Sequence, residues 1–180
     1  MTAEVVVMDQ LLFHPRVVHV PIALALLMPF IASGVAFAWW KGWFDRRVWV
    51  LVLLLQGVLV GSGALGMNTG EAEEERVEEV VPEAAIEAHE EAAEIFVWAS
   101  GILLGFMLVP LVLAEGQLRN AAVVTACIGT AIVLAFGFRA GQAGGRLVYE
   151  HGAAQVYVDA AESPGGVRAL EEYEDEGDED

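Results

Sequence analysis

The sequence predicts an all-α membrane protein, a four-transmembrane-helix bundle with both termini on the outer side and a small cap on that side. Three observations predict it. Hydrophobic residues make up 56% of the 180 residues although the formal charge is −17, so the charge must be segregated from the apolar mass. Four windows, 17–40, 48–67, 95–114 and 121–138, hold no charged residue. Each suits a bilayer core of about 30 Å, and none shows the polar stripe of a soluble amphipathic helix.

The first span, at about 17–40, follows a short outer segment, residues 1–13. It contains Pro21 and Pro29. Because proline has no N–H and its ring crowds the carbonyl four residues earlier, we expect bends in this helix. The second span, at about 48–67, carries Gln56, whose amide is suited to bridging two helices in lipid.

The third span, at about 95–114, is preceded by a segment with helical character of its own. From Pro82 the sequence PEAAIEAHEEAAEIF is rich in strong helix formers. We therefore expect the third helix to begin near Glu83 and to stand two or three turns above the bilayer. On this helix His89 falls on the inward stripe with Ala85, Ala92 and Phe96.

The fourth span, at about 121–141, ends the transmembrane domain, which we place at 14–158. Gly137, Gly141 and Gly145 recur every four residues, a spacing that allows close helix contact in lipid. The pair Gly144–Gly145 is expected to end the helix. Short β-prone runs at 147–149 and 156–158 then surround His151 and predict the small outer cap. Residues 159–180 form an acidic tail that we expect to be disordered.

Cations predict the orientation in the membrane. The two short connections, 41–47 and 115–120, hold four of the nine Lys and Arg residues in thirteen positions. The positive-inside rule places these connections in the cytoplasm. The expected location is therefore a multi-pass protein of the cell membrane with both termini on the extracytoplasmic side. An aromatic belt supports an interface near the first connection, and it consists of Trp39, Trp40, Trp43 and Trp49.

Acidic residues crowd the opposite side. Only Asp45 and Glu115 of the 26 acids fall on the predicted cytoplasmic side, and Lys41 is the one lysine. This negative surface excludes nucleic acid as a partner. It also resembles the surfaces of halophilic proteins, whose self-repulsion is screened by salt. We predict that thermal stability rises with KCl concentration, and a maximum at low salt would refute this interpretation.

Four histidines carry the functional interpretation: His14, His19, His89 and His151. The predicted topology brings all of them to the outer side, and histidine near membrane depth is rare and tends to be functional. Two imidazoles on facing helices can ligate haem b inside a bundle. By depth and direction His19 and His89 form the preferred pair, with His14 and His151 supporting it or completing a second site. Three nearby arginines can pair with propionates or extend to the head groups: Arg16, Arg139 and Arg146.

Two other interpretations stay open. In one, His14, His19, His89 and His151 converge on zinc or copper, with Glu90 or Glu94 assisting. In the other, the histidines only cap helices and bond backbone groups, and no cofactor is bound. The sequence holds no HExxH motif, Walker loop, dinucleotide fingerprint or Ser–His–Asp array, so a hydrolase or a nucleotide enzyme has no support.

Two segments carry a resemblance to a family. The segments 14–22 (HPRVVHVPI) and 144–152 (GGRLVYEHG) resemble the DUF2231 family of predicted membrane proteins, which shows an HPxxVHFPI-like start and a GGxLVYxHGxxV-like end around four spans. The resemblance covers roughly residues 11–158. This sequence departs from the pattern at Val20, where the family often has Phe, and at 153–155, where the family more often reads Val-Gly-Val. The matching positions are His14, Pro15, His19, Pro21, Gly144, Gly145, Tyr149, His151 and Gly152.

The resemblance implies a redox context, because relatives are found joined to Rieske or c-type cytochrome domains. That association favours electron transfer, and so the haem interpretation, over the others. The leading hypothesis is a histidine-ligated haem b site near the outer face, with redox proteins as partners. The alternative is a non-catalytic subunit or scaffold that packs in a larger membrane complex.

Overall fold

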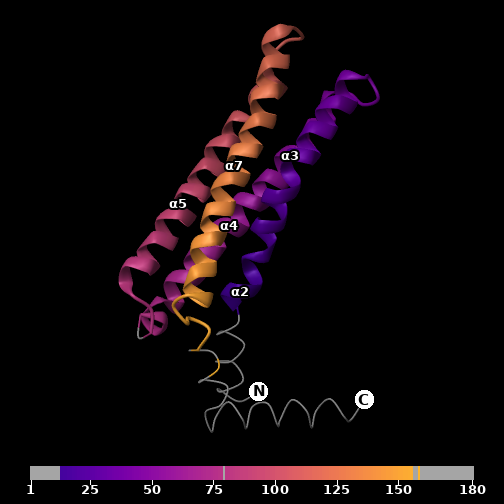
Figure 1. Cartoon of the computed structure of the whole chain (residues 1–180). Helices are drawn as coiled ribbons and strands as arrows, with labels where there is room; N and C mark the ends of the chain where they lie inside the picture. The colour runs from indigo at the N-terminus through magenta and orange to yellow at the C-terminus, as the bar shows by residue number, and fades with distance from the viewer. Residues whose placement is uncertain (1–12, 79, 156–157, 159–180) are drawn as a thin grey trace, which may run out of the picture.

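A computed structural model describes residues 13–78, 80–155 and 158, and it is built of helices in this part of the chain (Figure 1). Four long helices dominate, and short helices precede or follow three of them. In chain order the elements are α2 (Phe13–Val17), α3 (His19–Trp40), η1 (Arg46–Val48), α4 (Trp49–Val77), α5 (Glu83–Phe106), α6 (Val109–Val112) and α7 (Gln117–Tyr149). The predicted outer segment 1–13 and the acidic tail 159–180 lie outside the described residues, except for Phe13.

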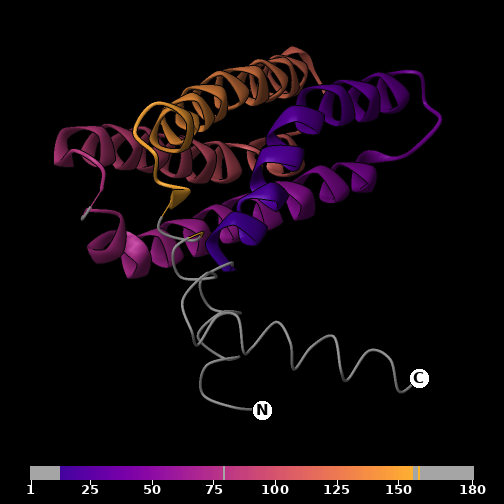
Figure 2. The ribbon, with the colours of Figure 1, turned by 60° about the horizontal axis from the view of Figure 1, so that its bottom comes forward.

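The long helices form a closed antiparallel bundle. Helix α3 packs against α4, α4 against α5, α5 against α7, and α7 returns to α3. Figure 2 shows α4 passing beneath both α3 and α5. The bundle has two distinct ends. One, the tryptophan end, holds Trp39, Trp40, Trp43 and Trp49, and the other, the histidine end, holds His14, His19, His89 and His151. The prediction that all four histidines share one end is confirmed.

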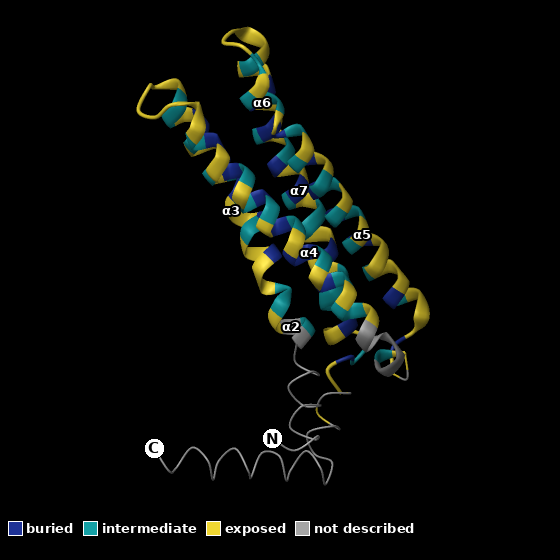
Figure 3. Cartoon of the chain, turned by 180° about the vertical axis from the view of Figure 1, so that it is seen from behind, coloured by how far each residue is buried: buried dark blue, intermediate teal, exposed yellow. Residues whose placement is uncertain are grey.

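The outer surface of the bundle is apolar over the middle part of the long helices. Large side chains such as Phe30 and Ile102, each 71% exposed, face away from the bundle, and exposed residues recur along each long helix in Figure 3. A soluble monomer does not tolerate so much contiguous apolar surface. Four helical stretches are long and apolar enough to cross a bilayer: His19–Trp40, Arg46–Glu71, Glu83–Val112 and Gln117–Tyr149. The chain is a four-span integral membrane protein, as its sequence predicts.

Small residues line the contact between α3 and its neighbours. Ala25, Ala32 and Ala36 of α3 are almost completely buried, as is Ala126 of α7. In lipid, helices associate mainly through van der Waals contact and hydrogen bonds, so small side chains that let backbones approach are favoured. One such hydrogen bond joins α4 to α5, because Gln56 Nε2 donates to the Ser100 carbonyl at 3.1 Å. The predicted bridging role of Gln56 is confirmed.

Prolines account for the two interruptions within spans. Pro21 cannot donate to the carbonyl of Val17, and the helix breaks at Val18, between α2 and α3. Pro110 likewise cannot donate to the carbonyl of Phe106, the last residue of α5, and the chain resumes as the short helix α6. Pro29 lies inside α3 without ending it. Where the sequence predicted bends at Pro21 and Pro29, the structure has a break at Val18, before Pro21, and a helix that continues through Pro29.

Two helices are longer than the sequence suggested. Helix α4 continues to Val77, so only 78–82 connect it to α5, because the Glu-rich stretch 71–76 favours helix above the span. Helix α7 continues through Gly144–Gly145 to Tyr149, and the residues 147–149 predicted as β-prone are helical. The helix ends instead before Gly152, whose φ of +76° lets the Ala153 N–H return to the Leu147 carbonyl at 2.9 Å. The start of α5 at Glu83 agrees with the prediction.

A buried tryptophan stabilises the break after α5. The Leu111 N–H donates to the Leu108 carbonyl and not to that of Met107. The Met107 carbonyl instead accepts a hydrogen bond from Trp49 Nε1 at 3.0 Å. Trp49 is fully buried. We predict that Trp49→Phe lowers the free energy of unfolding in detergent by about 1–3 kcal/mol, because it leaves a buried carbonyl unsatisfied.

The control for this variant is Trp98→Phe. Trp98 is 66% exposed and its indole donates to Glu94 in an exposed contact, so a change within about 0.5 kcal/mol is expected. Equal losses in the two variants would show that the Trp49 hydrogen bond contributes nothing specific.

Candidate histidine site

The first histidine of the site, His14, is held at the junction of α2 and α4. Its Nδ1 lies 2.9 Å from the Thr69 hydroxyl oxygen. That hydroxyl donates its own hydrogen to the Gly66 carbonyl at 3.0 Å. Thr69 Oγ1 therefore accepts from His14, which places the imidazole hydrogen on Nδ1. The His14 Nε2 then carries the lone pair.

The second, His89, lies between α5 and α7. Its Nδ1 is 3.2 Å from the backbone carbonyl of Ala140. A carbonyl only accepts, so Nδ1 donates here too, and Nε2 is the nitrogen with the lone pair. The side chain is half-buried. The hydrogen-bond network thus assigns the same tautomer to both histidines.

A glycine lies under each of these two imidazoles. An added Cβ at Gly70 of α4 would lie 3.3 Å from His14 Cε1, and one at Gly144 of α7 would lie 3.0 Å from His89 Cε1. The rings therefore pack directly on helix backbone. These two imidazoles come from different helices, α2 and α5, at the histidine end.

The structure places the other two histidines differently. His19, the preferred partner of His89 in the sequence analysis, is the first residue of α3 and is exposed. His151 is half-buried in the turn that follows α7. That turn packs through Ala153 against Val81 and Ile86, so it covers the start of α5. This turn is the part of the predicted outer cap that the structure describes.

The three arginines predicted to assist all lie at the surface. Arg16, Arg139 and Arg146 are exposed. Arg146 lies 4.0 Å from Glu150 one turn along α7, a solvent-exposed contact that contributes little stability. Arg139 immediately precedes Ala140, whose carbonyl holds His89. Exposed arginines at this end can reach an acidic group beside the histidines or extend to the head groups.

A metal site of three or more ligands is not assembled among the residues that the structure describes. These residues include all four histidines and Cys127, and no group of three His, Cys, Asp or Glu side chains there could hold an ion. Zinc prefers four protein ligands in closed sites and three in open ones.

Sequence reasoning missed the groups that orient the two histidines. Thr69 is a hydroxyl residue just beyond the second charge-free window, and its position hinted at a polar contact. Ala140 contacts His89 through its backbone carbonyl, and because every residue has this group, the sequence cannot indicate the contact. Gly144 was noted in the family motif and as a helix end, and its role in the structure is to make room for His89.

We predict that Gly144→Ala displaces the His89 ring. A methyl group at this position would press on Cε1 and Nδ1, at 3.0 and 3.4 Å, and weaken the bond to Ala140. The expected cost is about 1 kcal/mol of stability, with a shift of the His89 signals in NMR spectra of histidine-labelled protein.

Gly145→Ala is the matched control, because its Cβ would meet nothing within 4 Å. Its His89 signals should stay in place. Identical spectra for the two variants would mean that Gly144 does not support the ring.

Comparison with protein-family models, with curated proteins and with solved structures finds no match to this chain. The resemblance to the DUF2231 family therefore stays a prediction.

Proposed function

We propose that this four-span membrane protein binds haem b at its histidine end, where His14 and His89 would hold the iron, and that it takes part in electron transfer. The observation that carries the proposal is the tautomer shared by the two imidazoles. Histidines that ligate metals characteristically donate the other ring N–H to a carbonyl, a carboxylate or water, which fixes the ring and directs a lone pair at the metal. His89 has this arrangement with Ala140, and His14 has it with Thr69.

The donor set favours haem over zinc or copper. Six-coordinate haem needs two axial imidazoles, and facing helices of a bundle supply them well. Two imidazoles alone are too few for the usual zinc sites. When bound, haem would supply reversible one-electron chemistry. His14 and His89 would hold the iron, and the absence of a side chain at Gly70 and Gly144 leaves room for the Cε1 edge of each ring beside α4 and α7.

Exposed arginines complete the proposed site. Arg16, Arg139 and Arg146 lie at the histidine end and are suited to pairing with the propionates. The positive-inside rule places this end on the extracytoplasmic side, since four of the nine cations lie at the tryptophan end with only two of the 26 acids. Electron exchange would then occur at the outer membrane surface with a redox protein.

An absorbance spectrum of protein purified from haem-supplemented cells tests the proposal. A Soret band that shifts on adding dithionite, with one haem per chain in a pyridine haemochrome assay, is the expected result. A visible spectrum without a Soret band would end the haem proposal and favour a non-catalytic membrane subunit. Elemental analysis of the same sample for zinc and copper decides the remaining alternative.

A further inference from the structure

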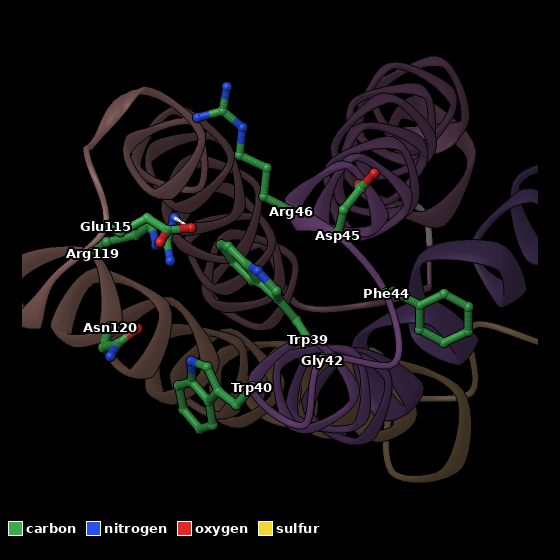
Figure 4. Close-up of a pocket in the computed structure, with 9 residues that line it drawn as sticks. All are labelled: Trp39, Trp40, Gly42, Phe44, Asp45, Arg46, Glu115, Arg119 and Asn120. Carbon is green, nitrogen blue, oxygen red and sulfur yellow. Dashed lines mark hydrogen bonds and ion pairs between the residues drawn. The ribbon is translucent and has the colours of Figure 1, made fainter.

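A second site-like feature lies at the opposite, tryptophan end. A cleft of about 530 Å³ opens between the connection after α3 and the start of α7. Figure 4 shows Trp39 in the middle of this cleft, with Arg119 and Glu115 on one side of it and Trp40 beside Asn120. The cleft is separate from the histidine site because it lies at the other end of the same helices (Figure 1).

The central group of the cleft is Arg119. Its side chain is only 12% exposed. The guanidinium lies over the Trp39 ring, 5.0 Å from the centroid, and among the described residues no group accepts from the buried Nε. A buried charged donor without an acceptor costs free energy that a bound anion would recover.

The nearby acid does not satisfy Arg119. Glu115 lies 3.4 Å from Nη1, and its own side chain is 89% exposed. A carboxylate so fully hydrated contributes little to an ion pair. Glu115 contacts Nη1 and not Nε, so the Nε–H of Arg119 still has no acceptor among the described residues.

The charge around the cleft suits an anion. The connections at the tryptophan end hold Lys41, Arg46, Arg47 and Arg119 against Asp45 and Glu115, so this end is net positive in a chain of formal charge −17. Arg46 and Asn120 line the cleft beside Arg119. The aromatic wall of Trp39 and Trp40 provides apolar surface next to these donors. Tryptophan and basic residues together are typical of sites at the level of lipid head groups.

We propose that the cleft binds a phosphate group, that of an anionic lipid, with Arg119 as its principal donor and Arg46 as a second. The planar guanidinium offers N–H donors in a geometry that matches phosphate oxygens. The glycerol and upper acyl chain would lie on Trp39 and Trp40. Such a lipid would sit between the α3–α4 connection and the start of α7, and would join the two halves of the bundle at this end.

Native mass spectrometry of the full chain tests the proposal. Protein in neutral detergent is titrated with phosphatidylglycerol or with phosphatidylcholine of the same acyl chains. The wild-type protein should retain phosphatidylglycerol preferentially. Arg119→Gln should weaken that binding about tenfold, because it removes a charge-assisted hydrogen bond made directly to the phosphate.

Arg47→Gln is the matched control. It removes the same charge from the same end, and Arg47 is exposed and outside the lining of the cleft. Its lipid binding should be unchanged. Equal retention of the two lipids by wild-type protein, or equal loss in Arg119→Gln and Arg47→Gln, would overturn the proposal.

Two further measurements keep the result interpretable. Circular dichroism reports on folding of Arg119→Gln, and if this variant fails to fold, the lipid preference of the wild-type protein decides. Inorganic phosphate is added as a competitor at millimolar concentration. Failure to displace phosphatidylglycerol supports the lipid as the ligand, whereas binding of phosphate alone with the same dependence on Arg119 would replace the lipid by soluble phosphate.

Discussion

Replacing His89 or His14 with alanine is expected to abolish the Soret band of haem-loaded protein. Each substitution removes one of the two imidazoles proposed to hold the iron, so haem would bind more weakly. The loss should be nearly complete for either residue, because the two ligands act on one metal and their effects are not additive. Absorbance spectra and haem content per chain provide the measurement.

His19→Ala and His151→Ala are the controls that distinguish the structural assignment from the sequence-based one. The sequence favoured His19 as the partner of His89, whereas the structure places His19 exposed and His14 on Thr69. If His14 is the ligand, both control variants keep the band. A band lost in His19→Ala but kept in His14→Ala would contradict the structural pairing and restore the sequence-based pair.

Gly137→Ala is expected to give the second large effect, a loss of about 1–3 kcal/mol in the free energy of unfolding. A Cβ there would lie 3.0 Å from Phe96 Cε2 and 3.6 Å from the Ala25 methyl group. Phe96 is a buried ring, and it or helix α7 would have to give by a few tenths of an ångström to admit the methyl group, whereas the distance to Ala25 is ordinary van der Waals contact. Thermal unfolding in detergent, followed by circular dichroism, measures the loss.

Gly141→Ala isolates this packing effect from helix propensity. Gly141 lies one turn further along α7, and its Cβ would meet nothing within 4 Å. Alanine there should leave stability unchanged or raise it slightly, because alanine favours helix more than glycine does. A destabilised Gly141→Ala protein would show that close packing extends further along α7 than the contacts of Gly137 indicate.

The glycine pattern shows what spacing alone does not reveal. The sequence grouped Gly137, Gly141 and Gly145 as one close-packed row, but a Cβ would meet a neighbour only at Gly137. Close approach is found instead at Gly129, beside Leu103, and at Gly144, beneath His89. A four-residue repeat drifts around a helix of 3.6 residues per turn, so a long row cannot stay on one contact face.

The ends of the helices show a similar division. The start of α5 at Glu83 was predictable, because Pro82 precedes a run of strong helix formers. The end of α7 was not, because Gly144–Gly145 looks like a stop signal on local grounds. In the structure Leu147 and Ala153 pack with Val81 and Ile86, and this contact with α5 keeps the helix intact to Tyr149. The burial of Leu147 therefore outweighs the weak tendency of Gly144–Gly145 to end the helix.

The number of spans follows from the charge-free stretches, and the alternation of direction between successive spans gathers the four histidines at one end and leaves only two of the 26 acids at the other. The contacts of His14 with Thr69 and of His89 with Ala140 depend instead on how the helices pack. The reason is that lipid-facing and bundle-facing surfaces of these helices are both apolar, so hydropathy leaves the rotation of each helix about its axis undetermined. Contacts with Thr69 and Ala140, 55 and 51 residues away along the chain, depend on that rotation.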